Sequence, residues 1–202
     1  MSSDNFWGYD IQGQCDDHTD CSPSHDCNNH HQLTKVVTFA NSLDNSLKGT
    51  YFVGQTPTLT LNNNIAYGAL FNPPNSRVNL FVNVFTITNF SDTPLTAEIW
   101  INSTPLPPWN ESPLVTTTNT ALHPTPLSKI ELIYKINSSP ITTGVNAFDR
   151  VVPGKTTIVA EEDGKYIVPP NKFFIITLTP MAPGPVTAAI AFGWWIKPIK
   201  GC

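Results

Sequence analysis

Thiol and imidazole side chains gather near the start of the chain. Three cysteines and four histidines occur within seventeen residues: Cys15, His18, Cys21, His25, Cys27, His30 and His31. Thiolate and imidazole are the usual ligands of zinc and copper ions. The cysteines lie six residues apart, with no C-x2-C pair to hold two ligands on one turn. A zinc site is one interpretation of the segment, and we expect weak binding because an unstructured chain must be ordered around the ion.

The cysteines also have a redox chemistry. A fourth one, Cys202, is the last residue of the sequence, and four cysteines allow three complete pairings. Disulfides need an oxidising environment, whereas the start MSSDNFWGYDIQGQ has neither the basic region nor the apolar run of a secretory signal. Release by cell lysis would remove this objection. Disulfides between copies, through Cys15, Cys21, Cys27 or Cys202, and a reduced tail both stay open.

The composition excludes several classes of protein. Of 202 residues only 13% are charged, and the formal net charge is −4, whereas a nucleic-acid-binding protein needs a basic surface. No apolar run approaches the roughly 20 residues of a membrane-spanning helix. We therefore expect no nucleic acid and no membrane as partners.

Charge is distributed unevenly along the chain. Residues 1–32 contain six Asp and no Lys or Arg, hence −6, and the remaining eleven basic and nine acidic residues give the rest of the chain +2. Few aliphatic residues lie between positions 13 and 32, too few to offset the entropy lost on ordering. We divide the chain into a non-globular N-terminal arm, residues 1–32, and a domain, residues 33–202. One apolar cluster in the arm either folds back on its own domain or plugs a neighbouring subunit: Phe6, Trp7, Tyr9 and Ile11.

The domain has the pattern of an all-β protein. Nineteen prolines and eleven glycines help to separate short apolar runs, at the spacing of about eight to twelve residues typical of an antiparallel β-sandwich or barrel. We predict strands over residues 35–39, 58–61, 65–71, 79–90, 97–102, 129–136, 145–152, 156–160, 166–168, 173–179 and 186–196. At most one more, over 114–117, lies in a long loop over 103–126. We predict no helix, pairing of 97–102 with 79–90, and a hairpin at Asp163-Gly164. The order favours a β-sandwich of the jelly-roll type.

Three tryptophans are candidate ligand or interface aromatics. Trp194 and Trp195 are adjacent in a predicted strand, so their side chains point to opposite faces and at least one lies outside the sandwich core. Trp109 lies in the long loop. An outward Trp typically contacts a partner subunit or a sugar ring. A carbohydrate site would also use His123.

Catalytic signatures do not occur in the sequence. We find no Ser-His-Asp set, G-x-S-x-G elbow, phosphate loop or H-E-x-x-H motif. His123 has no nucleophile or carboxylate near it in sequence. We predict no catalytic residues and no cofactor-binding residues, and therefore a protein that is not an enzyme.

Five short sequence segments of the domain resemble those of a known protein family. They are YFVGQTP at 51–57, NPP at 72–74, NLFVNV at 79–84, EEDGK at 161–165 and AFGWW at 191–195. They are similar to a family of uncharacterised proteins from spore-forming Gram-positive bacteria, over about residues 50–196. Because that family has no assigned activity, the resemblance implies no site residues.

The layout also resembles that of endospore appendage subunits, which join a jelly-roll body to a flexible Cys-bearing N-terminal connector. This chain differs from them in length and in the spacing of its arm cysteines, so the likeness is one of layout only. The leading hypothesis is a non-enzymatic structural protein that self-assembles through its sandwich and arm into a homo-oligomer or fibre. We expect it on the spore surface or extracellular after lysis, with the cytoplasm as the alternative. A carbohydrate- or ligand-binding sandwich module and a metal-binding protein using the arm are the other functions considered.

Overall fold

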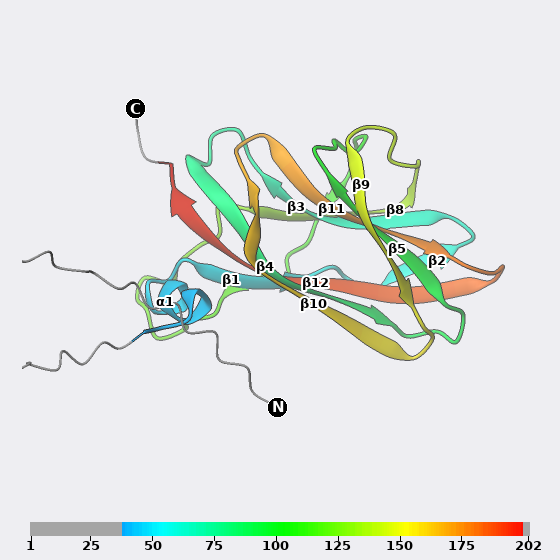
Figure 1. Ribbon diagram of the computed structural model, residues 1–202, viewed down its shortest axis with the longest axis horizontal. Helices are drawn as coiled ribbons and strands as arrows, with labels where there is room; N and C mark the ends of the chain where they lie inside the picture. Colours follow the sequence, from blue (N-terminus) through cyan, green and yellow to red (C-terminus); the bar gives the residue numbers. More distant parts are fainter. Residues whose placement is uncertain (1–37, 200–202) are drawn as a thin grey trace, which may run out of the picture. The chain divides into compact units, whose positions relative to one another are not determined.

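The computed structural model describes residues 38–199 as two antiparallel sheets and one short helix, α1 (Asn41–Leu47) (Figure 1). Sheet A has the order β10 (Thr156–Val168), β4 (Val78–Asn89), β12 (Pro185–Pro198), β1 (Tyr51–Gln55) and β7 (Val115–Thr117), and β2 (Leu59–Asn62) also pairs with β12. Sheet B has the order β6 (Asn110–Glu111), β8 (Glu131–Ser138), β3 (Ile65–Asn72), β11 (Lys172–Pro180), β5 (Leu95–Ile101) and β9 (Val145–Val152). The predicted all-β sandwich is confirmed, and the jelly-roll connectivity stays a prediction.

The core lies between the two sheets. Alternate side chains of sheet A, such as Phe52, Phe85 and Trp194, form one buried cluster with sheet B residues such as Leu70 and Phe174. Burying a side chain of this size contributes roughly 1.5–3 kcal/mol relative to leaving it exposed. The period-two alternation of apolar residues along the strands therefore holds the two layers together.

Two predictions about strand pairing are wrong: the pairing of residues 97–102 with 79–90, and the hairpin at Asp163-Gly164. β5 does not pair with β4: it pairs with β11 and β9 in sheet B, while β4 lies between β10 and β12 in sheet A. Strand sequences do not encode their partners, and the turn after β4 carries the chain to the other sheet. The predicted hairpin at Asp163-Gly164 is also absent, because β10 continues through it. The register against β4 shifts between Glu161 and Tyr166, and the intervening residues bulge out.

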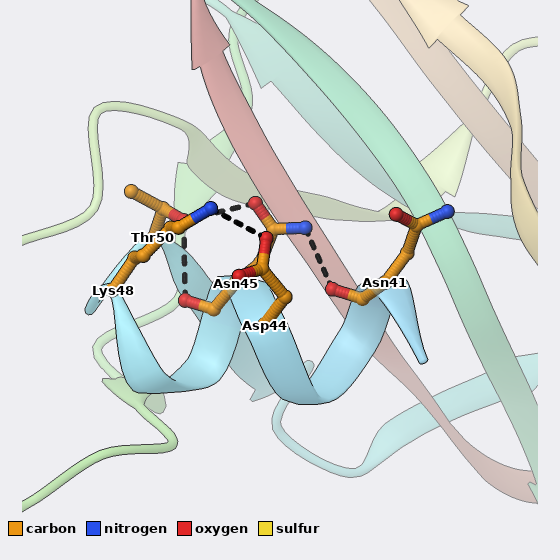
Figure 2. A network of polar contacts seen from close by, with 5 residues as sticks. All are labelled: Asn41, Asp44, Asn45, Lys48 and Thr50. Atoms are coloured by element: carbon orange, nitrogen blue, oxygen red, sulfur yellow. Dashed lines mark hydrogen bonds and ion pairs between the residues drawn. The ribbon is translucent and has the colours of Figure 1, made fainter. Parts of the chain in front are cut away.

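The prediction of no helix is wrong as well, and residues 38–39 of the first predicted strand lie before α1 without regular structure. Figure 2 shows how α1 is held. The Asn45 side chain donates to the Asn41 carbonyl at 2.7 Å, and the Thr50 hydroxyl donates to both the carbonyl and the side chain of Asn45 at 3.1 Å. The Lys48–Asp44 ion pair is exposed and contributes little. Tertiary contacts rather than helix propensity stabilise this short element.

The bulge of β10 covers Trp195 on the outer face of sheet A. Asp163 and Gly164 adopt φ values of +49° and +75°, and a Cβ atom on Gly164 would overlap the six-membered ring of Trp195. The Trp195 ring stacks on Phe81 with centroids 5.8 Å apart and lies 6.3 Å from the ring of Tyr51. Trp195 is therefore only 2% exposed although it lies outside the inter-sheet core.

We predict that Gly164→Ala destabilises the protein by about 2–4 kcal/mol, from left-handed backbone strain plus overlap with the indole. Gly184→Ala is the matched control, because Gly184 also has a positive φ, +128°, but nothing lies within 4 Å of its Cβ position. Urea unfolding measures both. Equal losses in the two variants would show that the contact with Trp195 is not tight.

Candidate functional site

A shallow apolar groove of about 460 Å³ crosses the outer face of sheet A. Its floor is β12, whose outward residues Ala191 and Gly193 are small. Register places Val53 and Val84 on either side of Gly193, and Gln55 and Thr86 on either side of Ala191. A large side chain at Ala191 would fill the groove, and one at Gly193 would overlap the Tyr51 hydroxyl.

Of the residues in the described part of the chain that line the groove, none carries an ionisable side chain. Its aromatic lining residues, Phe85 and Phe192, are 1% and 3% exposed because they belong to the core beneath. Leu114 and Thr116 add an exposed wall at the short strand β7. The groove therefore suits an apolar side chain better than a sugar, which needs an exposed aromatic platform and polar groups.

One end of the groove is closed by a hydrogen-bonded tyrosine. The Asn83 side chain donates to the Tyr51 hydroxyl at 2.7 Å, and this hydroxyl lies 2.6 Å from where a Cβ on Gly193 would be. Asn83 is the extra residue of a bulge in β4, since Gly193 pairs with Val84 while Trp194 pairs with Val82. Burial raises the pKa of Tyr51 above its ordinary value, while the Asn83 hydrogen bond opposes that shift.

A second apolar cluster lies on the outer face of sheet B. It contains Tyr67, Ala69, Ile133, Phe173 and Ile175, with Trp109 packed on it. The ring of Trp109 is 6.1 Å from Phe71 and 5.8 Å from Phe173, edge to face in each case. The long loop that contains Trp109 thus covers this face of the sheet.

Tyr67 is fully buried in this cluster, and its hydroxyl has no hydrogen-bond partner among residues 38–199. Burial raises the pKa of Tyr67 to about 12. At the rim of the same sheet, burial and the neighbouring charge of Glu111 raise the pKa of the Glu131 carboxyl. Glu131 on β8 and Glu98 on β5 are both half-buried.

The three tryptophans that the sequence suggested as ligand or interface residues lie in three different environments. Trp194 is fully buried in the core and stacks on Phe52 with centroids 6.2 Å apart. Trp195 lies outside that core, as expected of one of the pair, but the chain itself covers it. Trp109 is half-buried and His123 is exposed. A ligand or interface role for these tryptophans stays a prediction, and the burial of Trp194 and Trp195 does not support it.

The predicted metal and disulfide residues lie outside the described part of the chain: Cys15, His18, Cys21, His25, Cys27, His30, His31 and Cys202. Within residues 38–199, no three His, Cys, Asp or Glu side chains lie together as ligands for a metal ion. No helix of this part is long and apolar enough to cross a membrane.

Sequence reasoning missed the groove, although a signal for it exists. Two successive outward positions of β12, Ala191 and Gly193, hold small residues, whereas the inward positions beside them hold the large residues Ile190, Phe192 and Trp194. A run of small side chains on one face of a central strand leaves a trough between its neighbours. The predicted strand over 186–196 contained this pattern.

We predict opposite effects for removal of the two buried tyrosine hydroxyls. At pH 7, Tyr67→Phe leaves stability unchanged or raises it by about 1 kcal/mol because an unpaired group is lost, whereas Tyr51→Phe lowers it by about 1 kcal/mol because Asn83 loses its acceptor. From pH 10 to about 12 the unfolded state releases the Tyr67 proton while the folded state keeps it, so stability falls as pH rises.

Urea unfolding at pH 7 and at pH values above 10 tests this pair. The fall in stability above pH 10 should be smaller in Tyr67→Phe than in the wild type. A marked loss of stability in Tyr67→Phe at pH 7 would mean that its hydroxyl has a partner.

Comparison with known proteins places the chain without assigning it an activity. No curated protein and no solved structure matches it significantly. Residues 24–201 match DUF6143, a family of unknown function, and this span includes every strand of the sandwich. The chain therefore belongs to the DUF6143 family.

Proposed function

We propose that this protein is a non-enzymatic structural subunit that self-assembles through its β-sandwich and N-terminal arm. The observation that carries the proposal is an asymmetry between the two sides of the sandwich. On one side each sheet ends at a long strand, β9 of 8 residues and β10 of 13 residues, with one partner each in the described structure. The strands paired at the other ends are short, namely β2, β6 and β7.

The open side exposes large apolar side chains. They are Val145 and Val151, each 60% exposed, and Phe148 on β9, with Val159 and Ile167 on β10. We call these two strands the β9/β10 rim. A long edge strand with exposed apolar residues is a template for pairing with another chain. Charges and a bulge, which oppose such pairing, are confined to Asp149 and Arg150 of β9 and to residues 161–165 of β10, and the apolar residues lie outside them. The rim therefore fits a contact between copies.

Charge favours the arm as a second contact. The arm carries −6 and the remainder of the chain +2, so the arm of one copy is attracted to the domain of another. Arg77, Lys172 and Lys197 belong to strand ends and turns around the start of β4, since Lys172 pairs with Asn72 and Lys197 with Asn79. Aspartates of an arm would find basic partners there.

The connectivity supports a jelly roll as the form of this subunit. Strands β2, β3, β4 and β5 alternate between sheets A, B, A and B, and β9, β10, β11 and β12 run B, A, B and A. Two such four-strand sets are what a jelly roll contains. The short strands β6 and β7, with β8, lie in the insertion between the two sets.

A location at the spore surface or outside the cell after lysis is part of the proposal, and it rests on the likeness in layout to endospore appendage subunits. Neither nucleic acid nor a membrane is a proposed partner. The groove favours an apolar ligand over a carbohydrate, so a ligand-binding module is the second candidate function.

We predict that Val151→Lys, which places a charge on the rim, converts the assembled protein to monomers. Leu127→Lys is the matched control, because Leu127 is 84% exposed but lies in a loop away from both rim strands. Light scattering after size-exclusion chromatography measures the mass. The proposal fails if the wild type is monomeric at all concentrations, or if Val151→Lys assembles like Leu127→Lys.

We also predict that Cys202 forms a disulfide with Cys15, Cys21 or Cys27 of another copy. The adjacent Lys197 and Lys200 attract the arm's aspartates and favour the reactive thiolate. Non-reducing gel electrophoresis should show a ladder for the wild type that is lost in Cys202→Ser. A ladder that persists unchanged in the variant, or no ladder in the wild type, contradicts this pairing.

A further inference from the structure

We propose that the groove on sheet A binds the segment 5–11 (NFWGYDI) in the arm of a second copy, an inference that rests on the proposed self-assembly. The groove is apolar, has a volume of about 460 Å³ and is lined by no ionisable side chain of residues 38–199. A groove of this size lies within the roughly 300–1,000 Å³ of sites that hold small ligands or side chains. Its occupant must therefore be apolar and uncharged where it touches the floor.

The segment 5–11 has this chemistry. Phe6, Trp7 and Tyr9 are the only aromatic residues before Phe39, and residues 5–9 are uncharged. In an extended chain, residues two apart point to the same side, so Trp7, Tyr9 and Ile11 would share one face. Asp10 would then point away from the groove, and its charge would stay in water.

The periodicity of the segment also matches that of the groove floor. Ala191 and Gly193 are two residues apart on β12, and their outward positions form the trough. An extended segment lying along β12 repeats at the same interval of about 6.6–6.8 Å per two residues. One large side chain of the segment would thus lie over Ala191, and the next would lie beside Gly193, where the Tyr51 hydroxyl closes the groove.

The length of the chain before the domain allows the segment to reach a second copy. Residues 12–37 separate the segment from Thr38, where the described structure begins, and they span up to roughly 85 Å when extended. The five strands of sheet A from β10 to β7 cover only about 20 Å at about 4.8 Å per strand. Such a reach is several times the width of the sheet and suffices to place the segment on the groove of a neighbour.

The groove is continuous with the rim that the proposed function uses. Ala191 pairs with Thr86 of β4, and Thr86 pairs with Val159 on β10. The same row of outward residues therefore runs from the groove to the open edge. A copy held at the rim would have its arm within reach of the groove.

Photo-cross-linking of the full chain tests the inference. Trp7 is replaced by p-benzoylphenylalanine, and Gln14, a polar arm residue outside the segment, carries the probe in a control. We expect the Trp7 probe to give a dimer band in which the cross-linked peptide includes residues 53–55 or 191–193. The control should give at least fivefold less of this product.

Two further variants test the groove itself. Ala191→Leu fills the floor and should reduce the dimer cross-link at least fivefold, whereas Ala189→Leu, two residues along the same face and outside the lining, should leave it unchanged. Circular dichroism and urea unfolding establish that both fold. If Ala191→Leu does not fold, Trp7→Ser is used instead, with loss of oligomer mass as the expected result.

The possible failures are distinguishable. The groove assignment is overturned if the cross-links form within one chain or at other surfaces. It is also overturned if Ala191→Leu does not reduce the dimer cross-link. If the protein that fails this test is still oligomeric by light scattering, the proposed self-assembly stands without binding of the arm in the groove. A monomeric sample overturns the proposed function itself.

Discussion

The alternation of side chains along β12 is the constraint on which the rest of the structure depends. This strand pairs with β4, β1 and β2, and its inward residues, from Val186 to Ile196, are buried in the core. Two sheets pack only if one face of each is continuously apolar. The bulge at Asn83 keeps β4 in step with β12, so that Val82 and Phe85 both point inward on either side of it.

The same alternation shapes the outer face of sheet A. Where the outward residue of β12 is large, at Trp195, the chain covers it with Tyr51, Phe81 and the bulge at Gly164. Where the outward residues are small, at Ala191 and Gly193, the Tyr51 hydroxyl covers Gly193 but Ala191 stays partly exposed, and a groove results. One strand therefore accounts for a closed aromatic end and an open apolar trough on one surface.

Much of the fold was predictable because it rests on local pattern. The strand over 145–152 coincides with β9, and those over 173–179 and 186–196 lie within β11 and β12. Period-two alternation and turn residues mark strands wherever one face is buried. The β1 strand was missed, since Gly54 interrupts its short apolar run, and α1 was missed because NSLDNSL is a weak helix former held by tertiary hydrogen bonds.

Pairing and burial were less predictable, because they depend on residues far away in sequence. The Asp163-Gly164 pair signals left-handed backbone, and the structure uses it for a bulge onto Trp195 rather than a hairpin. The two adjacent tryptophans were correctly separated onto opposite faces, but only the fold shows that Trp195 is covered. The thiol and imidazole cluster, the most conspicuous chemical feature of the sequence, lies outside the described residues.

Electron microscopy of the purified, non-reduced full-length protein tests the central claim most directly. A subunit with two open edge strands and a long acidic arm should form ordered particles or fibres with a regular subunit repeat. Dispersed particles of the size of one 22.2 kDa chain, at every concentration examined, would contradict the account.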